Sequence, residues 1–325
     1  MRKTLVVYHY YQKDISYRDN FLHFLTFGYS KECDYIVVLA GPHTLDLPCA
    51  ENISYIFTEN LGNDFGGYCH VINTVIDINK YEFFFFINSS VRGPFLTARD
   101  HNLWTEYFIE QLKPDVGIVG ATINILPMTS PCSISYSEKY GHAENHSHIQ
   151  STSYLLPRRS LLYLVENGFF HSSGIPDKED AIRDYEVRLS QLIKERGWNL
   201  KSLLPEYNQI DYRIPHIDIN PTSDQGDPCF KDGYFGRTIH PNEIIFIKTN
   251  RNIYDLSYLD RLACSMLASR DLTKEDLKCT SLDTYRSRIN LAKTSKIRLS
   301  FIPLNKAYLL LLKRTIRRIR GKNSY

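Results

Sequence analysis

The stretch EFFFFINSSVRGPF, residues 82–95, decides the fold. Its first half, Glu82–Ile87, is apolar on both faces of a strand, which is typical of a strand buried between two layers of helices. Its second half, Asn88–Phe95, turns abruptly polar, and polar groups that end a buried strand must be satisfied locally or face a ligand. We therefore expect a covered strand with a candidate site at its carboxyl end.

The flanking sequence alternates between strand and helix patterns. Apolar runs predict six further strands, at Thr4–Tyr10, Tyr35–Ala40, Ile53–Phe57, Val116–Ala121, Ser151–Leu156 and Leu200–Leu204, and a last one at Glu243–Lys248. Helical spacing predicts helices at Arg18–Phe27, Tyr68–Ile78, Leu103–Leu112, Arg159–Glu166 and Glu179–Arg196. The region Asn208–Gly236 is rich in Asp, Pro and Gly and is expected to be a long loop. This order predicts an α/β fold, a Rossmann-like, mostly parallel sheet with helices on both faces.

Cysteine usage and hydropathy limit the class of protein. The seven cysteines include no C-x-x-C pair, which argues against a secreted disulfide framework and a structural zinc site. No run approaches the roughly 20 apolar residues that span a bilayer, and the first residues read as a strand rather than a signal peptide. We expect a cytoplasmic protein.

Charge is divided unevenly along the chain. After Asp283 there are twelve Lys or Arg residues and no Asp or Glu, so the net charge of +3 combines a basic end with an acidic body. Residues 301–325 combine an apolar stripe with basic side chains, which is typical of an amphipathic helix in an anionic membrane interface, although a helix packed on the protein would have the same pattern. We expect three parts: the α/β domain at 1–255, a helical extension at 256–300 and this tail at 301–325. Nucleic acid is not an expected partner, because its binding requires a basic folded domain.

The first motif, residues 59–68, reads ENLGNDFGGY and opens a helix after the third strand. Glycines allow a ligand close to the backbone, and a helix N-terminus offers free N–H groups to phosphate oxygens. The candidate donor-binding residues here are Asn60, Gly62, Asp64, Gly66 and Gly67. A capped glycine turn without a ligand would show the same pattern.

The second motif is the polar end of the Phe-rich strand. Asn88, Ser89 and Ser90 are further candidate donor-binding residues, and Arg92 is a candidate to neutralise a diphosphate. A capped strand end is the alternative interpretation. The two motifs follow adjacent strands, which strengthens the interpretation as a nucleotide site.

The order of these and three later segments resembles GT-A-like glycosyltransferases related to the rhamnan synthesis protein F family. The later segments are HIQS at 148–151, DYEVRLS at 184–190 and YFGRTIHPNE at 234–243. The resemblance covers roughly residues 1–250 and implies a GT-A-like fold and sugar transfer from a nucleotide-sugar donor.

The resemblance also implies a metal site, which this sequence departs from. GT-A enzymes usually carry Asp-x-Asp at the end of the strand, and its carboxylates hold Mn²⁺ or Mg²⁺ on the donor diphosphate. The matching residues here are Asn88-Ser89-Ser90, whose neutral oxygens bind a hard cation weakly. Two arrangements stay open: Asp64 and His240 supply the ligands, or Arg92 and Arg237 replace the charge of the metal.

The remaining candidates concern the acceptor. An inverting transferase needs a carboxylate to take the proton of the acceptor hydroxyl, and Glu186, with Asp184 behind it, is the candidate base. Both are equally compatible with solvated charges near a helix start. His148 and Gln150 are expected to line the acceptor cleft, and Tyr234 to contact the acceptor from the following loop. A His142–His148 metal site is disfavoured, because the segment is polar and lacks a fourth ligand.

These observations predict an inverting hexosyl- or deoxyhexosyltransferase peripheral to the inner face of the membrane. Its acceptor would be a cell-surface polysaccharide, such as capsule or O-antigen, or a lipid-linked glycan. A non-catalytic nucleotide-sugar-binding scaffold of a glycan assembly complex is the main alternative, supported by the missing Asp-x-Asp. A nucleotidyltransferase is less favoured, because residues 6–14 lack a glycine-rich phosphate loop. The donor sugar, the linkage and the oligomeric state are not predicted.

Overall fold

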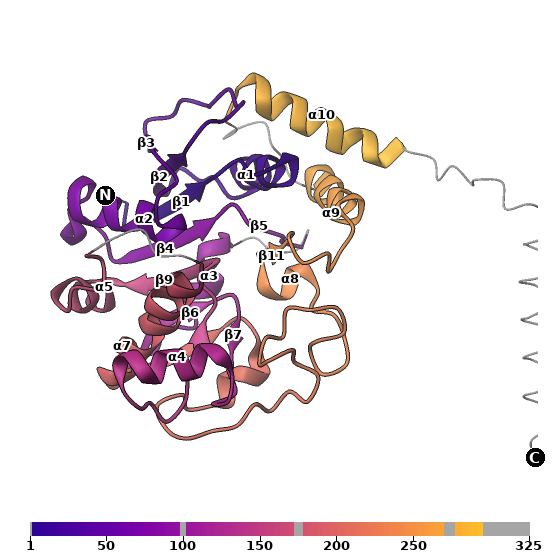
Figure 1. Cartoon of the computed structure of the whole chain (residues 1–325). Helices are drawn as coiled ribbons and strands as arrows, with labels where there is room; N and C mark the ends of the chain where they lie inside the picture. Colours follow the sequence, from indigo (N-terminus) through magenta and orange to yellow (C-terminus); the bar gives the residue numbers. More distant parts are fainter. Residues whose placement is uncertain (1, 98–101, 172–177, 270–276, 295–325) are drawn as a thin grey trace, which may run out of the picture.

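The computed structural model describes residues 2–97, 102–171, 178–269 and 277–294. Its centre is a seven-stranded sheet (Figure 1). The strands, in spatial order, are β10 (Asn199–Ser202), β6 (Val116–Gly120), β9 (Ser153–Pro157), β4 (Phe83–Asn88), β1 (Thr4–Tyr10), β2 (Cys33–Ala40) and β3 (Ile53–Thr58). All are parallel to one another except β9, which runs antiparallel to both β4 and β6. The predicted mostly parallel α/β fold is therefore confirmed.

Helices cover both faces of the sheet. The elements outside the sheet are α1 (Ile15–Phe27), α2 (Asn63–His70), η1 (Val71–Val75), η2 (Ile78–Lys80), α3 (Trp104–Ile109), α4 (Pro131–Tyr140), α5 (Arg158–Glu166), α6 (Lys178–Ala181), η3 (Ile182–Val187), α7 (Arg188–Glu195), η4 (Pro205–Gln209), α8 (Pro241–Ile244), α9 (Leu256–Ser269) and α10 (Thr280–Thr294). Two ribbons lie beside the sheet, β5 (Val91–Arg92) with β11 (Ile247–Lys248) and β7 (Ile123–Asn124) with β8 (His148–Ile149).

Alternating aromatic residues fix which helix lies on which face. On one face, Tyr8 of β1 packs against Phe24 of α1 with ring centroids 4.6 Å apart, and Phe85 of β4 packs on Trp104 of α3 at 4.9 Å. On the other face, Phe86 lies 5.0 Å from Tyr68 of α2. The buried aromatic rings supply a large apolar area and geometrically specific contacts, so the Phe-rich strand forms the middle of the core.

The C-terminal helices extend the same core. Figure 1 shows α10 beside α9 and α1, and these helices contact one another. Leu259 of α9 and Leu282, Tyr285 and Ile289 of α10 are buried in one hydrophobic cluster with the sheet. The boundary expected at residue 255 stays a prediction, and the tail 301–325 lies outside the described residues. Within the described residues, no helix is long and apolar enough to cross a membrane.

One predicted strand is wrong in most of its length. Residues 241–244 form the short helix α8, and only Ile247–Lys248 is strand. The reason is local: His240 caps the helix, Pro241 starts it, and Glu243 completes a capping box. Helix α4 was not predicted, although Ser130 caps it and Pro131 begins it in the same manner.

Candidate functional site

A cleft of about 910 Å³ opens at the carboxyl ends of β1 and β4. Because β9 runs antiparallel to β4, the residues that precede β9 lie at the same edge of the sheet. The backbone N–H of Asn88 donates to the carbonyl of Thr152 there at 3.1 Å. The cleft is lined by His9, Tyr11, Lys13, Tyr17, Asn60, Asn63, Asp64, Phe65, Asn88, Ser89, Ser90, Asn124, Leu126, Cys132, His148, Ser151, Thr152, Ala181, Ile182, Glu186, Lys248, Asn250 and Arg251. The topology thus gathers both sequence motifs in one cavity.

The glycine motif gives the cleft its shape rather than its ligands. Gly62 precedes α2 and adopts a left-handed conformation (φ 72°). Residues with a Cβ rarely adopt this conformation. A Cβ on Gly66 would overlap the carbonyl of Leu61, and one on Gly67 would lie 2.6 Å from the His9 ring. Gly62, Gly66 and Gly67 are not among the lining residues. They let α2 pack closely, so that Asn60 and Asp64 face the cavity.

A polar chain joins α2 to the end of β4. The side-chain amide nitrogen of Asn88 donates to Asp64 at 2.8 Å, and its side-chain oxygen accepts from the Ser90 hydroxyl at 2.5 Å. Ser89 instead holds the segment after β1, exchanging hydrogen bonds of 3.1 Å with the backbone of Tyr11. Burial, together with the negative charge of Glu186, raises the pKa of Asp64 to about 6, although the Asn88 hydrogen bond opposes the shift.

Glu186 lines the same cleft as Asp64. It lies in the π-helical turn η3, and its carboxylate accepts from the Ser151 hydroxyl at 2.9 Å and lies 3.6 Å from Nε2 of His148. Burial alone would raise the pKa of Glu186, but His148, the charge of Lys248 and Ser151 together lower it to about 2. Two carboxyl groups of one cleft therefore have pKa values shifted in opposite directions, an arrangement found in acid–base sites.

Of the two predicted acceptor residues 148 and 150, only the first lines the cleft. His148 lines the cleft, and its Nδ1 lies 3.0 Å from the carbonyl of His146. Gln150 is buried behind it and donates to Asn124, which lines the cleft, at 2.6 Å. Gln150 is thus placed as a support for Asn124.

Two predicted residues lie close to the cleft but are turned away from it. Arg92 is fully buried, donates to Asn20 at 2.9 Å and forms an ion pair of 3.0 Å with Asp260 of α9. Asp184 accepts from Lys139 at 2.7 Å and Tyr140 at 2.9 Å, both in α4. Neither lines the cavity. Arg92 is engaged by Asp260, and Asp184 is engaged by α4 and by its neighbour Arg183, which lies 2.7 Å away.

The loop residues predicted around 234–240 are not brought to the cleft. Arg237 forms two hydrogen bonds of 2.7 Å with Glu243, and the buried Tyr234 donates to Glu206. His240 caps α8 and lies 3.2 Å from the hydroxyl of Tyr258. These contacts hold the loop to η4, α8 and α9, and they use the polar groups that the sequence suggested for a ligand.

Sequence reasoning missed the residues that follow β1 and those of β11. Tyr11 and Lys13, between β1 and α1, and Tyr17 in the first turn of α1 line the cleft, as do Lys248 of β11 and Arg251 after it. The segment after β1 could have been found from its place at the end of a parallel strand. Lys248 gives no local signal, because its strand is two residues long and pairs with a segment far away in the sequence.

The cleft does not fit a resident divalent metal. Within the described ranges, no three His, Cys, Asp or Glu side chains gather where an ion would be held. Asp64 and the candidate ligand His240 are not brought together, and the Asn88 oxygen is engaged by Ser90. Mg²⁺ and Mn²⁺ favour several oxygen ligands including carboxylates, so this donor set is poor.

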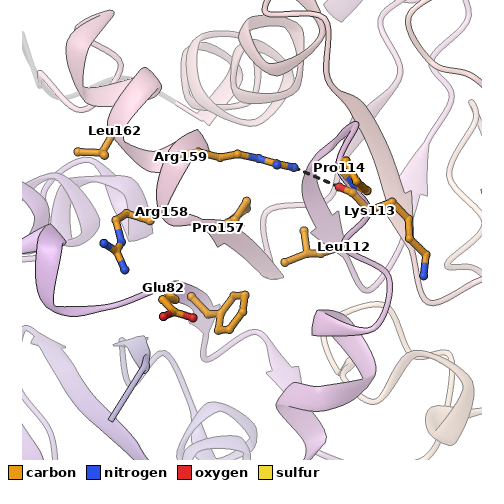
Figure 2. Close-up of a pocket in the computed structure, with 9 residues that line it drawn as sticks. Glu82, Leu112, Lys113, Pro114, Pro157, Arg158, Arg159 and Leu162 are labelled. Atoms are coloured by element: carbon orange, nitrogen blue, oxygen red, sulfur yellow. Dashed lines mark hydrogen bonds between the residues drawn. The ribbon is translucent and has the colours of Figure 1, made fainter. Parts of the chain in front are cut away.

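A second hollow of about 620 Å³ lies at the opposite edge of the sheet, where β4 begins and β9 ends. Figure 2 shows its side chains, which come from the beginning of β4 and the residue before it, the end of β9, the loop before β6 and the start of α5. Arg159 points across it and donates to the carbonyl of Lys113 at 3.1 Å, and Arg158 donates to the carbonyl of Tyr81 at 2.6 Å. These cations cap backbone groups, so the first cleft is the better candidate.

The chain is similar to several solved structures, each at 10% sequence identity. These are the galactosyltransferase LgtC in complex with donor and acceptor sugar analogues (80% of this chain and 95% of that chain, TM-score 0.38), the mannosyltransferase PcManGT from Pyrobaculum calidifontis in complex with GDP-Man and Mn²⁺ (97% and 80%, 0.36) and the glycosyltransferase GlyE in Streptococcus pneumoniae TIGR4 (64% and 47%, 0.31). No protein-family model and no curated protein matches the sequence. Likenesses this distant carry no functional argument, and function is inferred from the cleft itself.

Proposed function

We propose that this chain is a GT-A-like glycosyltransferase, of the kind related to rhamnan synthesis protein F, that transfers a sugar from a nucleotide-sugar donor to a glycan acceptor. The observation that carries the proposal is the pair of carboxyl groups, Asp64 and Glu186, with pKa values moved apart to about 6 and about 2 in one large polar cleft. Paired carboxyl groups with separate tasks are suited to chemistry at an acetal carbon.

The donor would lie along the α2 side of the cleft. Asn60, Asn88 and Ser90 offer amide and hydroxyl groups to a nucleotide or sugar, and Tyr11 and Tyr17 offer rings that can stack on a base or a sugar face. The acceptor would enter beside His148 and Asn124. In a direct displacement the acceptor oxygen bonds to the anomeric carbon, the bond from that carbon to the phosphate oxygen breaks, and the acceptor proton passes to a carboxylate.

The two carboxylates suit different steps. Glu186 was the expected base, but a carboxylate with a pKa of about 2 holds a proton weakly. Asp64, with a pKa of about 6, is better matched to proton transfer near neutral pH. We assign proton acceptance to Asp64 and, to the ionised Glu186, stabilisation of the positive charge that develops at the anomeric carbon.

The test is nucleotide release from UDP-, GDP- and dTDP-sugars, with and without Mn²⁺. We expect slow hydrolysis of one donor by the wild type and its loss in Asp64→Asn and Glu186→Gln. Glu82→Gln, in the second hollow, is the matched control and should be unchanged. Because the charge of Glu186 raises the pKa of Asp64, any residual activity of Glu186→Gln should show an acid limb below that of the wild type.

A non-catalytic binding module remains the second candidate, favoured by the poor fit to a metal within the described residues. It predicts that a nucleotide sugar binds without turnover, even when membrane extract supplies the acceptor. That result, with unchanged binding in Glu186→Gln, would replace the catalytic proposal.

We further propose that residues 301–325 hold the enzyme against an anionic membrane surface, beside a lipid-linked or cell-surface glycan such as capsule or O-antigen. The support is the sequence of the tail alone, where Lys313, Arg314, Arg317, Arg318 and Arg320 surround an apolar stripe. Cosedimentation of the full chain with phosphatidylglycerol vesicles, compared with a variant whose five basic residues are Gln, tests it. Equal sedimentation of both would contradict it.

A further inference from the structure

Lys248 is held at the wall of the cleft by two elements. Its strand, β11, pairs antiparallel with β5, placing Lys248 opposite Val91. The next residue fixes the strand to the polar motif, because the amide of Thr249 donates to the carbonyl of Ser90 at 3.1 Å. Neighbouring Ile247 is buried in the core, so the alternation along the strand turns Lys248 to the cavity, which it lines.

The positive charge of Lys248 is not used elsewhere in the part of the chain that the structure describes. It takes part in none of the ion pairs found there, whereas Arg251, another lining cation, is paired with Asp227. Lys13, the third, is exposed on the rim. Lys248 is half-buried, and its charge acts on the same carboxylate, Glu186, that the chemistry is assigned to. A cationic side chain beside Ser90 is therefore available to a ligand.

A nucleoside diphosphate brings more than one negative charge into this cleft. Charge removed from water must be compensated, and a divalent metal is the usual means where carboxylates can hold one. The cleft lacks such a set, and the basic candidates expected from the sequence, Arg92 and Arg237, are committed to Asp260 and Glu243. A lysine ammonium binds phosphate as a point charge.

We propose that Lys248 is the counter-charge for the diphosphate of a nucleotide-sugar donor, and that this cleft binds its donor without a divalent metal. The proposal rests on the proposed function and names the residue that replaces the metal. It also fits the neutral side chains of Asn88 and Ser90 at the end of β4, which offer no carboxylate to a metal.

The experiment measures binding of UDP, GDP and dTDP by calorimetry, in EDTA and in Mn²⁺, to the wild type and three variants. We expect the preferred nucleotide to bind the wild type equally in EDTA and in Mn²⁺. Lys248→Met should weaken it by roughly 10- to 100-fold, the range for a lost hydrogen bond to a charged group. Lys248→Arg, which keeps the charge, should stay within several-fold of the wild type. Lys231→Met, an exposed lysine outside the cleft, is the matched control and should bind as the wild type.

Different failures have different meanings. Binding that requires Mn²⁺, or binding by a folded Lys248→Met that equals the wild type, overturns the role of Lys248 and leaves the glycosyltransferase proposal standing. A wild type that binds none of the three nucleotides in either condition overturns both. Circular dichroism and thermal melting of each variant show that it is folded, and Lys248→Gln is the second neutral variant should Lys248→Met unfold.

Discussion

The two hollows at opposite edges of the sheet differ less in size than in what their charged groups do. At the amino edge, about 620 Å³ in volume, Arg158 and Arg159 donate to backbone carbonyls. At the carboxyl edge, about 910 Å³, Asp64 and Glu186 face one cavity with pKa values moved in opposite directions. Charged groups that stabilise the fold and charged groups that can act on a ligand therefore differ in their hydrogen-bond partners and not in the volume of the hollow that they line.

The direction of the strands accounts for this difference. The carboxyl ends of β1, β3 and β4 lead into segments that can carry polar side chains without breaking the sheet, and the start of antiparallel β9 adds Ser151 there. At the amino edge, β4 and β6 begin at or just after residues whose carbonyls need donors, and the arginines supply them. The predictions below test whether the two edges are separate in function.

The largest expected effect is on turnover at the carboxyl edge. Asp64→Asn removes the proposed proton acceptor and should lower nucleotide-sugar turnover by about 10²- to 10⁴-fold, the usual contribution of a general base. In the wild type, the pH–rate profile should rise through an acid limb near pH 6, because Asp64 must be ionised to accept a proton. An acid limb near pH 2 would return the role of base to Glu186, and loss of activity in the amino-edge control Glu82→Gln would break the comparison.

The same substitution should stabilise the fold. The pKa of Asp64 is raised from 3.8 to about 6, so the folded state binds the proton more tightly than the unfolded state. The stability due to the protonated carboxyl is complete below about pH 4 and is lost as pH rises through 6. Between pH 4 and pH 8 the wild type should therefore lose about 2–3 kcal/mol of unfolding free energy that Asp64→Asn does not lose, as measured by urea unfolding. A pH-independent difference would contradict this shift.

The sheet was predictable because its strands are continuous apolar runs, which leave little choice of structure. Phe83–Ile87 has no polar face and can only be buried on both sides. The segment 243–248 was predicted wrongly except at Ile247–Lys248. Its apolar residues suggest a strand, but His240 and Glu243 form a capping box that starts a helix. A local sequence pattern predicts secondary structure best where strand and helix-capping signals do not compete.

Most of the predicted residues that line the cleft are neutral polar residues or carboxylates, together with His148. Asn60, Asp64, Asn88 and Glu186 follow or face strand ends, and all of them reach the cleft. Arginine was misjudged, because the ion pair of Arg92 with Asp260 joins residues 168 positions apart and no local pattern reveals it. Lys248 was missed for the same reason, since its neighbour across the ribbon is Val91. Long-range pairing decides which cations remain for a ligand.

A glycine at the carboxyl edge sharpens the comparison by separating packing from binding. A Cβ at Gly66 would overlap the carbonyl of Leu61, so Gly66→Ala should destabilise the fold by about 1–3 kcal/mol, the range for overpacking. Gly141→Ala is the control: Gly141 has φ +90° and ψ 174° and no atom within 4 Å of a Cβ built on it, so its cost, about 1–3 kcal/mol, is that of the backbone conformation alone. If Gly66→Ala weakened nucleotide binding while keeping full stability, the motif would contact the ligand after all.

The smallest effect is expected at the amino edge, and it is the most direct test of the difference between the two hollows. Arg159→Gln removes guanidinium hydrogen bonds to the carbonyls of Lys113 and Val116 and should cost about 1 kcal/mol in the free energy of unfolding. Nucleotide release should be unchanged, because these bonds hold the loop before β6 and reach nothing in the cleft. A drop in release with no loss of stability would mean that the second hollow takes part in function. The two edges would then not be functionally separate.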